Sequence, residues 1–394
     1  MLIMKKVIFG TALASMALLS ACSSDNELAN VETTANNAIG FHVVGNKAET
    51  RATPITPNNI NTTDFYVYAY IKNAEGKDGS PFMGGNDNEL GTNGINISYQ
   101  SGNWSYTNPG DIRYWPTSDT KLNFYAVNTG STPLLFSWKF TNTQKEISYL
   151  CYDEYSASNF YIDKKDGIKK QHLTNKDAMY AVAKEQTYDT NNGKVTFTFK
   201  HILSQVVFKA KTQYDNDMEV DINAVSIYNF QTGGTFKIEG EEPAQSNWTL
   251  NETYPSGGGF TVKKVETGKN IKVNNSKSEN AKEISDGPML FVPQKLTKWA
   301  VPSTIAAANT AQQSYLKITC KIEQGGAYLF GSDTEYKDLY VPFEADWQPG
   351  KRYIYTLIFG GGYNAQGQAI LQPINFEAET SDWVDGTGSG NIDM

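Results

Sequence analysis

The chain has 394 residues, enough for about two domains of ordinary size. Charged residues make up 19 % of it, and 33 glycines and 23 tyrosines give it the composition of a folded, turn-rich protein, which excludes an extended disordered chain. The net charge is −8 and no basic face stands out, which argues against nucleic acid or anionic lipid as the main partner.

The first 22 residues have the organisation of a secretion signal. Two lysines precede the apolar run of residues 7–19, and Leu19-Ser20-Ala21-Cys22 ends it with small residues before a cysteine. The apolar run is shorter than the roughly 20 residues that a membrane-spanning helix needs. Because the tetrapeptide matches the lipobox of bacterial lipoproteins, we predict a signal peptide over 1–21 and an acyl anchor on Cys22. An ordinary signal peptide with an incidental cysteine is the alternative.

An alternating segment and an exposed linker follow the leader. Residues 23–38 are polar and aperiodic, as expected of a tether. Residues 39–44 alternate so that Ile39, Phe41 and Val43 share one face, which predicts a strand. Residues 45–63 are rich in asparagine, threonine and proline, which is typical of an exposed linker. Arg51 in the middle of this linker is open to a protease; an ordinary solvated arginine is the alternative.

The remainder of the chain consists of short alternating runs separated by turn residues. Residues 95–99 and 103–106 flank Ser101-Gly102 and predict a hairpin. Residues 201–210 are expected to join two domains, as a short helical turn that leads into a strand. Further strands are predicted at residues 64–71, 121–127, 177–183, 194–199, 221–230, 234–238, 289–292, 315–323, 337–343 and 351–359. This pattern predicts an all-β fold of two antiparallel β-sandwiches in tandem, over residues 52–203 and 204–394.

The sequence contains few motifs that are typical of catalytic or metal-binding sites. There is no GxSxG, P-loop, HExxH or CxxC motif, and His42, His172 and His201 have no catalytic or metal-binding spacing. We therefore predict no catalysis, no cofactor and no metal site. Cys151 and Cys320 are expected to be buried free thiols, with a disulfide between them as the alternative.

Clustered tyrosines allow two interpretations. Residues 66, 68 and 70, and residues 353 and 355, are tyrosines at alternate positions of predicted strands. They could form a platform on which sugars stack, but we favour a structural role on the outer face of a sandwich or at the domain contact.

Several short motifs in a fixed order resemble the fimbrillin family, the type V pilins of Bacteroidales. The resemblance includes the leader and spans nearly the whole chain. The motifs are IGFHV (39–43), TRATP (50–54), FYVYAY (65–70), YWP (114–116), LNFYA (122–126), FKHILSQV (199–206), VPQ (292–294), WQPGKRYIY (347–355) and SDW (381–383).

The resemblance implies two transthyretin-like, Greek-key β-sandwich domains and export as a lipoprotein to the outer surface of the cell. It also implies that an arginine-specific, trypsin-like protease cuts the linker, so that Arg51 precedes the cut and Ala52 becomes the new N-terminus. Residues 22–51 would then be a lipidated propeptide, and residues 39–44 a temporary strand within it.

Removal of this strand would leave an open sheet edge that demands a partner. A strand from the next subunit would fill it by β-augmentation. The candidate donor is the C-terminal segment 369–384, with Ile370, Ile374 and Phe376 as its apolar contacts. Pro373 interrupts the alternation of the donor, which leaves stalk, tip and accessory positions open.

We therefore expect the precursor of a fimbrial subunit that supports cell adhesion, located in the outer membrane and then in a fimbrium on the cell surface. Its expected partners are other fimbrial subunits, the outer membrane through the lipid, the protease, and a receptor on a host or bacterial surface, without nucleic acid. One alternative is a lipid-anchored glycan-binding protein of a polysaccharide-utilisation system, which would keep the lipid on Cys22. The other alternative is a hydrolase with a pair of carboxylates in a cleft.

Overall fold

The structure is a computed structural model of the 394-residue chain. All described residues belong to one compact unit, residues 37–394. The structure describes residues 37–44, 60–85, 94–117, 119–128, 136–153, 160–162, 169–171, 175–190, 192–213, 218–251, 259–265, 270–277, 280–285, 287–360, 363–369, 375–382 and 390–391.

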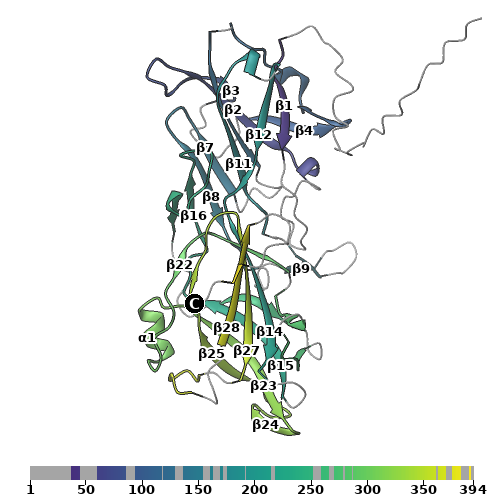
Figure 1. Ribbon diagram of the computed structural model, residues 1–394, viewed down its shortest axis with the longest axis vertical. Helices are drawn as coiled ribbons and strands as arrows, with labels where there is room; N and C mark the ends of the chain where they lie inside the picture. The colour runs from purple at the N-terminus through teal and green to yellow at the C-terminus, as the bar shows by residue number, and fades with distance from the viewer. Residues whose placement is uncertain are drawn as a thin grey trace, which may run out of the picture. The chain divides into compact units, whose positions relative to one another are not determined.

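A seven-stranded sheet forms the centre of the N-terminal half (Figure 1). The hairpin predicted at Ser101 and Gly102 forms between β4 and β5, and the φ angles of these residues, 51° and 87°, fit a type I′ turn. The hydrogen-bonded order is β13 (Lys200–His201), β11 (Met179–Gln186), β6 (Leu122–Asn128), β2 (Phe65–Lys72), β4 (Ile95–Gln100) and β5 (Asn103–Tyr106), and β3 (Asp78–Met83) pairs with β2.

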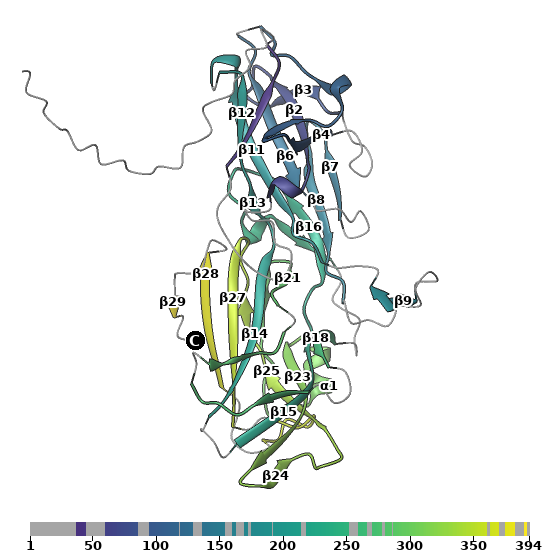
Figure 2. The ribbon, with the colours of Figure 1, turned by 90° about the vertical axis from the view of Figure 1, so that its right-hand side faces the viewer.

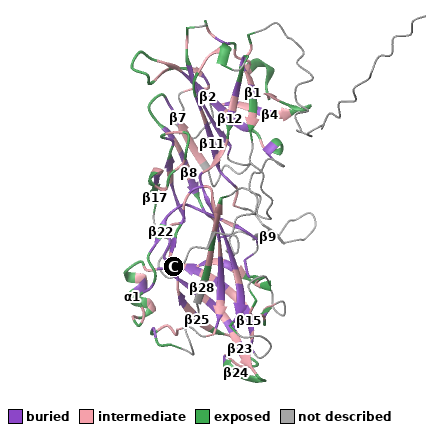
Figure 3. Ribbon diagram, in the orientation of Figure 1, coloured by how far each residue is buried: buried purple, intermediate pink, exposed green. Residues whose placement is uncertain are grey.

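Both faces of this central sheet are covered. On β2, Phe65 and Val67 face a core that includes β1 (Gly40–Val44) and β12 (Lys194–Thr198), while Tyr68 and Tyr70 face the opposite core. Figure 3 shows β2 and β11 as largely buried strands. The expectation that the tyrosines cover an outer face is wrong, because a second sheet packs on them. Tyr68 and Tyr70 are fully buried, so they offer no platform for a sugar.

That second sheet has four strands taken from distant parts of the chain. The Tyr68 ring stacks on Phe140 with the ring centroids 4.5 Å apart. The order is β17 (Trp248–Leu250), β16 (Gly233–Lys237), β8 (Lys145–Leu150) and β7 (Phe136–Phe140). Residues 233–250 thus pair with residues 136–150, on either side of the expected boundary at residue 203; the division into two domains stays a prediction.

Two six-stranded sheets form the C-terminal half (Figure 2). Trp347 stacks on Phe291 between them, with centroids 5.2 Å apart. The first sheet contains β14 (Ser204–Thr212), β20 (Lys282–Glu283), β21 (Met289–Phe291), β27 (Lys351–Phe359), β28 (Asn375–Asp382) and β29 (Gly390–Asn391). The second contains β15 (Met218–Tyr228), β18 (Phe260–Lys264), β19 (Ile271–Val273), β23 (Tyr315–Gln324), β24 (Ala327–Phe330) and β25 (Lys337–Pro342).

The all-β fold predicted from the sequence is confirmed, but its pairing is not purely antiparallel. Strand β14 pairs with β27 in parallel, and β1 pairs with β12 in parallel. The one α-helix of the described residues, α1 (Ile305–Thr310), was not predicted. No helix among the described residues is long and apolar enough to cross a membrane. The smaller pairs are β9 (Phe160–Ile162) with β10 (Lys169–Gln171) and β22 (Lys295–Leu296) with β26 (Ala345–Asp346).

The joint at residues 200–204 contains no helical turn, so the expectation of such a turn before the strand is wrong, while the strand itself forms as β14. Ile202 and Leu203 are fully buried, and each uses its backbone carbonyl for a tertiary contact. The Trp248 Nε1–H donates to the Ile202 carbonyl over 3.1 Å, and the Gly350 N–H donates to the Leu203 carbonyl over 2.9 Å. Because these carbonyls bond to distant residues, they are not free to close a helical turn.

We expect Phe236→Ala to destabilise the folded chain strongly. The Phe236 ring is fully buried on β16 and lies 5.4 Å from the Tyr180 ring and 5.5 Å from the Trp248 ring, centroid to centroid. Truncating such a ring costs about 3–5 kcal/mol of unfolding free energy, measured by chemical denaturation. Lys237→Ala, at the next and exposed position, should change it by less than about 0.5 kcal/mol. Equal effects of the two substitutions would show that β16 does not pack in this core.

Candidate functional site

The strand predicted at residues 39–44 forms as β1 and lies beside β12 (Figures 1 and 2). The two strands are parallel, with Phe41 opposite Val195 and Val43 opposite Phe197. Among the described residues, β12 forms a ladder with no strand other than β1. In the described part of the chain, the backbone groups along this edge of β12 therefore pair with the N-terminal segment alone.

The start of β1 is fixed by backbone hydrogen bonds on both sides. The Ile39 N–H donates to the Arg113 carbonyl over 2.9 Å, and the Gly40 N–H donates to the Gly193 carbonyl over 2.9 Å. The Trp115 indole N–H donates to the same Gly193 carbonyl, also over 2.9 Å. A side chain at Gly40 would bring a Cβ atom 3.1 Å from Lys194 Cγ, so glycine suits this close approach.

The apolar side chains of β1 complete one core of the N-terminal half. Ile39 and Phe41 are 1 % and 6 % exposed, whereas Val43 is half-buried. The Phe41 ring stacks on Phe197 at 6.0 Å and meets the edge of the Tyr106 ring at 5.5 Å, centroid to centroid. The alternation predicted from the sequence therefore places these side chains on the buried face.

We name the surface under this strand the β1 bed: Phe65, Tyr106, Trp115, Val195 and Phe197, all of which belong to or pack on the same apolar core as Ile39 and Phe41. Loss of β1 would expose these side chains together with the backbone edge of β12. Burial of Ile39 and Phe41 contributes about 3–6 kcal/mol gross, at about 1.5–3 kcal/mol for each side chain, and the half-buried Val43 adds less than a full side chain. A partner that replaced β1 would need apolar side chains at alternate positions.

A polar pocket of about 370 Å³ lies between β12 and β11. A 3₁₀ helix at Tyr188–Thr190 follows β11 in the chain, and β12 pairs with β1 instead of with the central sheet. Lys184 on β11 and Thr196 on β12 line the pocket. Lys200 also lines it and forms an ion pair of 2.7 Å with Glu242. This pocket lies on the side of β12 that faces away from its ladder with β1.

The other site residues predicted from the sequence are only partly covered by the structure. Cys22, Arg51, Ala52, Ile370 and Ile374 lie outside the described residues. Within the candidate donor segment, residues 375–382 form β28 and pair with β27 of the chain's own sheet, with Phe376 opposite Leu357. The lipidation, processing and donor roles stay predictions.

The two remaining cysteines are free and buried, as the sequence predicts. The Cys151 thiol donates to the Leu290 carbonyl over 3.2 Å, and burial raises its pKa to about 12. Burial likewise raises the pKa of the Cys320 thiol. No group of three or more metal-ligating side chains occurs in the part of the chain that the structure describes.

Two pairs of ionisable side chains, of which the second is buried on both sides, were not predicted from the sequence. His201 Nδ1 lies 2.8 Å from Asp177 Oδ2 at the joint between the two halves. Lys145 pairs with Asp78 between the central sheet and the four-stranded sheet. The signal for the second pair was present, because the alternation of residues 145–149 puts Lys145 on the same face as Ile147 and Tyr149.

Comparison with known proteins adds to this geometry. A family model described as fimbrillin-like matches residues 50–383 of the chain. The Fimbrium subunit Fim1C of Phocaeicola vulgatus is 27 % identical over 202 residues, which are 48 % of this chain and 48 % of that protein, so the match spans about half the length of this relative. A crystal structure of a fimbrial protein from Bacteroides vulgatus aligns with a TM-score of 0.52 at 18 % identity, covering 89 % of this chain and 100 % of that one. The structural likeness concerns the fold alone.

We expect Phe41→Ala to destabilise the unprocessed chain by about 3–5 kcal/mol, because it empties the centre of the contact between β1 and the β1 bed. The free energy of unfolding, measured by chemical denaturation, checks this. Val44→Ala is the matched control on the same strand, since Val44 is 42 % exposed. If the two substitutions had equal effects, the β1 contact would not stabilise the precursor.

We expect Cys151 and Cys320 to resist modification in the folded chain. At pH 8 little of the Cys151 thiol is ionised, because its pKa is raised to about 12, and the thiolate is the reactive form. In a Cys22→Ser background, a thiol reagent should modify neither cysteine before denaturant is added and both afterwards. Rapid modification in the native state would contradict the burial of these side chains.

Proposed function

Because the chain belongs to the fimbrillin-like family, we propose that it is the precursor of a fimbrial subunit. It is exported as a lipoprotein anchored through Cys22, cleaved after Arg51, and polymerised by strand exchange into a surface fimbrium that supports cell adhesion. The observation that supports this proposal most is the position of β1. It is the only ladder partner of β12 among the described residues, and the sequence connects it to the body through the linker that contains Arg51.

Cleavage at this linker separates β1 from the remainder of the chain without breaking any described strand. In the precursor, the covalent connection keeps β1 at a high effective concentration beside β12. After the cut the connection is gone, and the strand is held by non-covalent contacts alone: the ladder with β12, the hydrogen bond from Ile39 to Arg113, and the apolar side chains of β1. Cleavage of the linker thus converts a stable precursor into a chain whose strand β1 can be exchanged.

The partner that fits the vacated position is an extended segment of another fimbrial subunit. Backbone groups of that segment would pair with β12, and apolar side chains at alternate positions would fill the β1 bed. The candidate donor is residues 369–384 with Ile370, Ile374 and Phe376. To act as the donor, β28 would have to detach from β27. The new pairing with the next subunit therefore has to compensate for the lost ladder between β27 and β28.

The proposed sequence of export, cleavage and polymerisation involves three further partners. The outer membrane holds the acylated precursor, an arginine-specific protease releases β1, and a receptor on a host or bacterial surface is the target of adhesion. Neither catalysis nor a cofactor has a part in this cycle. Burial of Tyr68, Tyr70 and Tyr355 removes the aromatic platform on which the glycan-binding alternative depended.

Arg51→Ala should leave lipid-anchored monomer and abolish the polymer, because the protease would lack its arginine and β1 would stay in place. Mass spectrometry of the protein on the cell surface should find wild-type chains that begin at Ala52. Lys47→Ala, in the same linker, is the matched control and should be processed normally. Wild-type surface protein with acylated Cys22 and an intact Arg51–Ala52 bond, or polymer in the Arg51→Ala variant, would overturn the proposal.

A further inference from the structure

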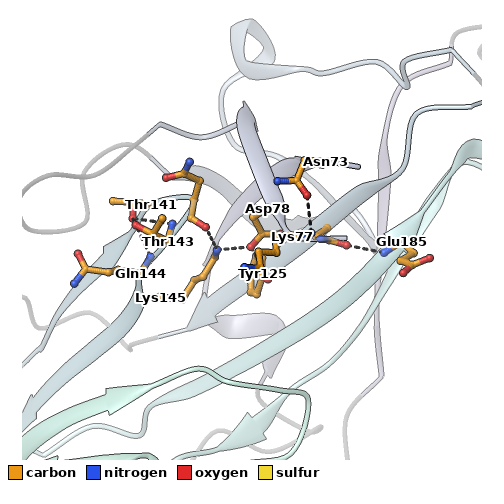
Figure 4. Close-up of polar contacts among 11 residues, drawn as sticks. Asn73, Lys77, Asp78, Tyr125, Thr141, Thr143, Gln144, Lys145 and Glu185 are labelled. Atoms are coloured by element: carbon orange, nitrogen blue, oxygen red, sulfur yellow. Dashed lines mark hydrogen bonds and ion pairs between the residues drawn. The ribbon is translucent and has the colours of Figure 1, made fainter. Parts of the chain in front are cut away.

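Four side chains meet between the central sheet and the four-stranded sheet, and Figure 4 labels three of them, Asp78, Tyr125 and Lys145. Asp78 is the first residue of β3, Asn123 and Tyr125 are on β6, and Lys145 is the first residue of β8. The side chains of Lys145 and Asp78 form an ion pair and are only 8 % and 7 % exposed. In Figure 4 the Lys145 side chain points at Asp78, with Tyr125 beside them. A buried lysine with these neighbours is in a position to do more than form an ion pair.

The Asp78 carboxyl group bridges an amine and an amide. Its Oδ2 accepts hydrogen bonds from Lys145 Nζ and from the Tyr125 hydroxyl, the latter over 2.8 Å. Its Oδ1 accepts a hydrogen bond of 2.7 Å from the side-chain amide nitrogen of Asn123. The carboxyl group of Asp78 therefore lies between the amine of Lys145 and the amide of Asn123 and accepts a hydrogen bond from each.

The oxygen of the same amide is held by a backbone donor. The Glu185 N–H donates to Asn123 Oδ1 over 2.9 Å. A bulge between Ala183 and Gln186 creates this contact, and Glu185 adopts a φ of 56°, which is unusual for a residue other than glycine. A backbone N–H aimed at an amide oxygen stabilises the negative charge that develops there when a nucleophile attacks the carbonyl carbon.

Burial of Lys145 favours its reactive form, the neutral amine, whereas Asp78 and the faces of two tyrosine rings favour the ammonium. Nζ lies 4.6 Å from the centroid of the Tyr70 ring and 4.8 Å from that of the Tyr125 ring. Burial lowers the pKa of Lys145, although Asp78 acts in the opposite direction. A desolvated lysine amine beside a group that accepts its proton is a nucleophile of the kind that forms covalent bonds to carbonyl carbons.

We propose that Lys145 and Asn123 form an intramolecular isopeptide bond, with Asp78 as the proton carrier. Asp78 takes a proton from the Lys145 ammonium, and Nζ then attacks Cγ of Asn123 while the Glu185 N–H holds the oxygen. Asp78 returns the proton to the amide nitrogen of Asn123, the Cγ–Nδ2 bond breaks, and ammonia leaves. Of the three ammonium protons, one stays on the new amide, one leaves with the ammonia, and one leaves as a proton that the ammonia can bind. No oxidant or reductant is needed.

The bond would join the two sheets of the sandwich covalently. Asn123 belongs to the central sheet and Lys145 to the four-stranded sheet, so the cross-link would prevent these layers from separating. It would also close the chain between residues 123 and 145 into a loop, which restricts the unfolded state as a disulfide does.

The chain contains an internal control for this chemistry. Lys321 Nζ lies 5.0 Å from the Tyr336 ring centroid, and it is 4.0 Å from Asp221 Oδ2, which accepts a hydrogen bond from the Tyr336 hydroxyl. Among the described residues, no side-chain amide donates to the Asp221 carboxyl group. Lys321 therefore shares the aromatic and acidic neighbours of Lys145, but the nearby amide of Asn270 donates to the Tyr336 hydroxyl, and no amide is held by Asp221 as Asn123 is held by Asp78.

Tryptic digestion of the denatured full-length protein tests the proposal. Trypsin cannot cleave after a cross-linked Lys145, so the expected product joins residues 122–139 to residues 140–164 and is lighter than the two peptides together by one ammonia. Fragmentation should place the bond between Asn123 and Lys145. Separate peptides 122–139 and 140–145 at their sequence masses would overturn the proposal, and so would a bond from Lys145 to Asp78 with loss of water.

Single substitutions then test the role of each side chain in bond formation. Lys145→Arg, Asn123→Ala and Asp78→Ala should each abolish the cross-linked peptide, whereas Lys321→Arg should retain it in full. Retention in the Asp78→Ala variant would overturn the role of Asp78 as proton carrier. Because the wild-type digest decides whether the bond exists, the test does not depend on any variant folding.

Discussion

The edge of β12 is the constraint on which the N-terminal half depends. The strand lies outside the central sheet, and among the described residues its ladder partner is the strand β1. Unpaired backbone groups next to an apolar surface are costly, because water cannot replace the hydrogen bonds without exposing that surface. The fold is therefore stable only with a strand at this position, which the N-terminal segment supplies in the structure.

The parallel direction of that pairing has a consequence for any replacement. A parallel partner needs no tight turn to reach its place, so a strand from another chain can lie beside β12 as readily as one from the same chain. Side-chain alternation then decides the register, because a shift by one residue would place polar groups in the β1 bed. Specificity of the proposed exchange thus lies in the apolar positions of the donor, while the backbone ladder supplies affinity that does not depend on sequence.

The fold could be predicted well where alternation and turn chemistry act locally. The strand at residues 39–44 and the hairpin at Ser101-Gly102 formed where period-two patterns and turn residues placed them. The pattern of β2 was misinterpreted, because a strand buried on both faces can place tyrosines in one core and aliphatic residues in the other. The pairing of β16 with β8 could not be predicted, since ladders between distant segments leave no local signal in a single sequence. The sequence indicated no strand at Lys145, because the surrounding residues lack a long regular pattern, although its alternation with Ile147 and Tyr149 fits the burial observed.

The two proposed events act on opposite faces of the central sheet. Successive residues of β6 belong to different sides, with Phe124 in the core beneath β1 and Tyr125 in the core beneath β8. Exchange of β1 has to open the first face, and a sandwich that opens on one face risks losing the other layer as well. A covalent bond from Asn123 to Lys145 would hold the central sheet to the four-stranded sheet while the opposite core is transiently exposed. The polar network around Asp78 would then support strand exchange indirectly, because it keeps the β1 bed in its folded conformation while no strand covers it.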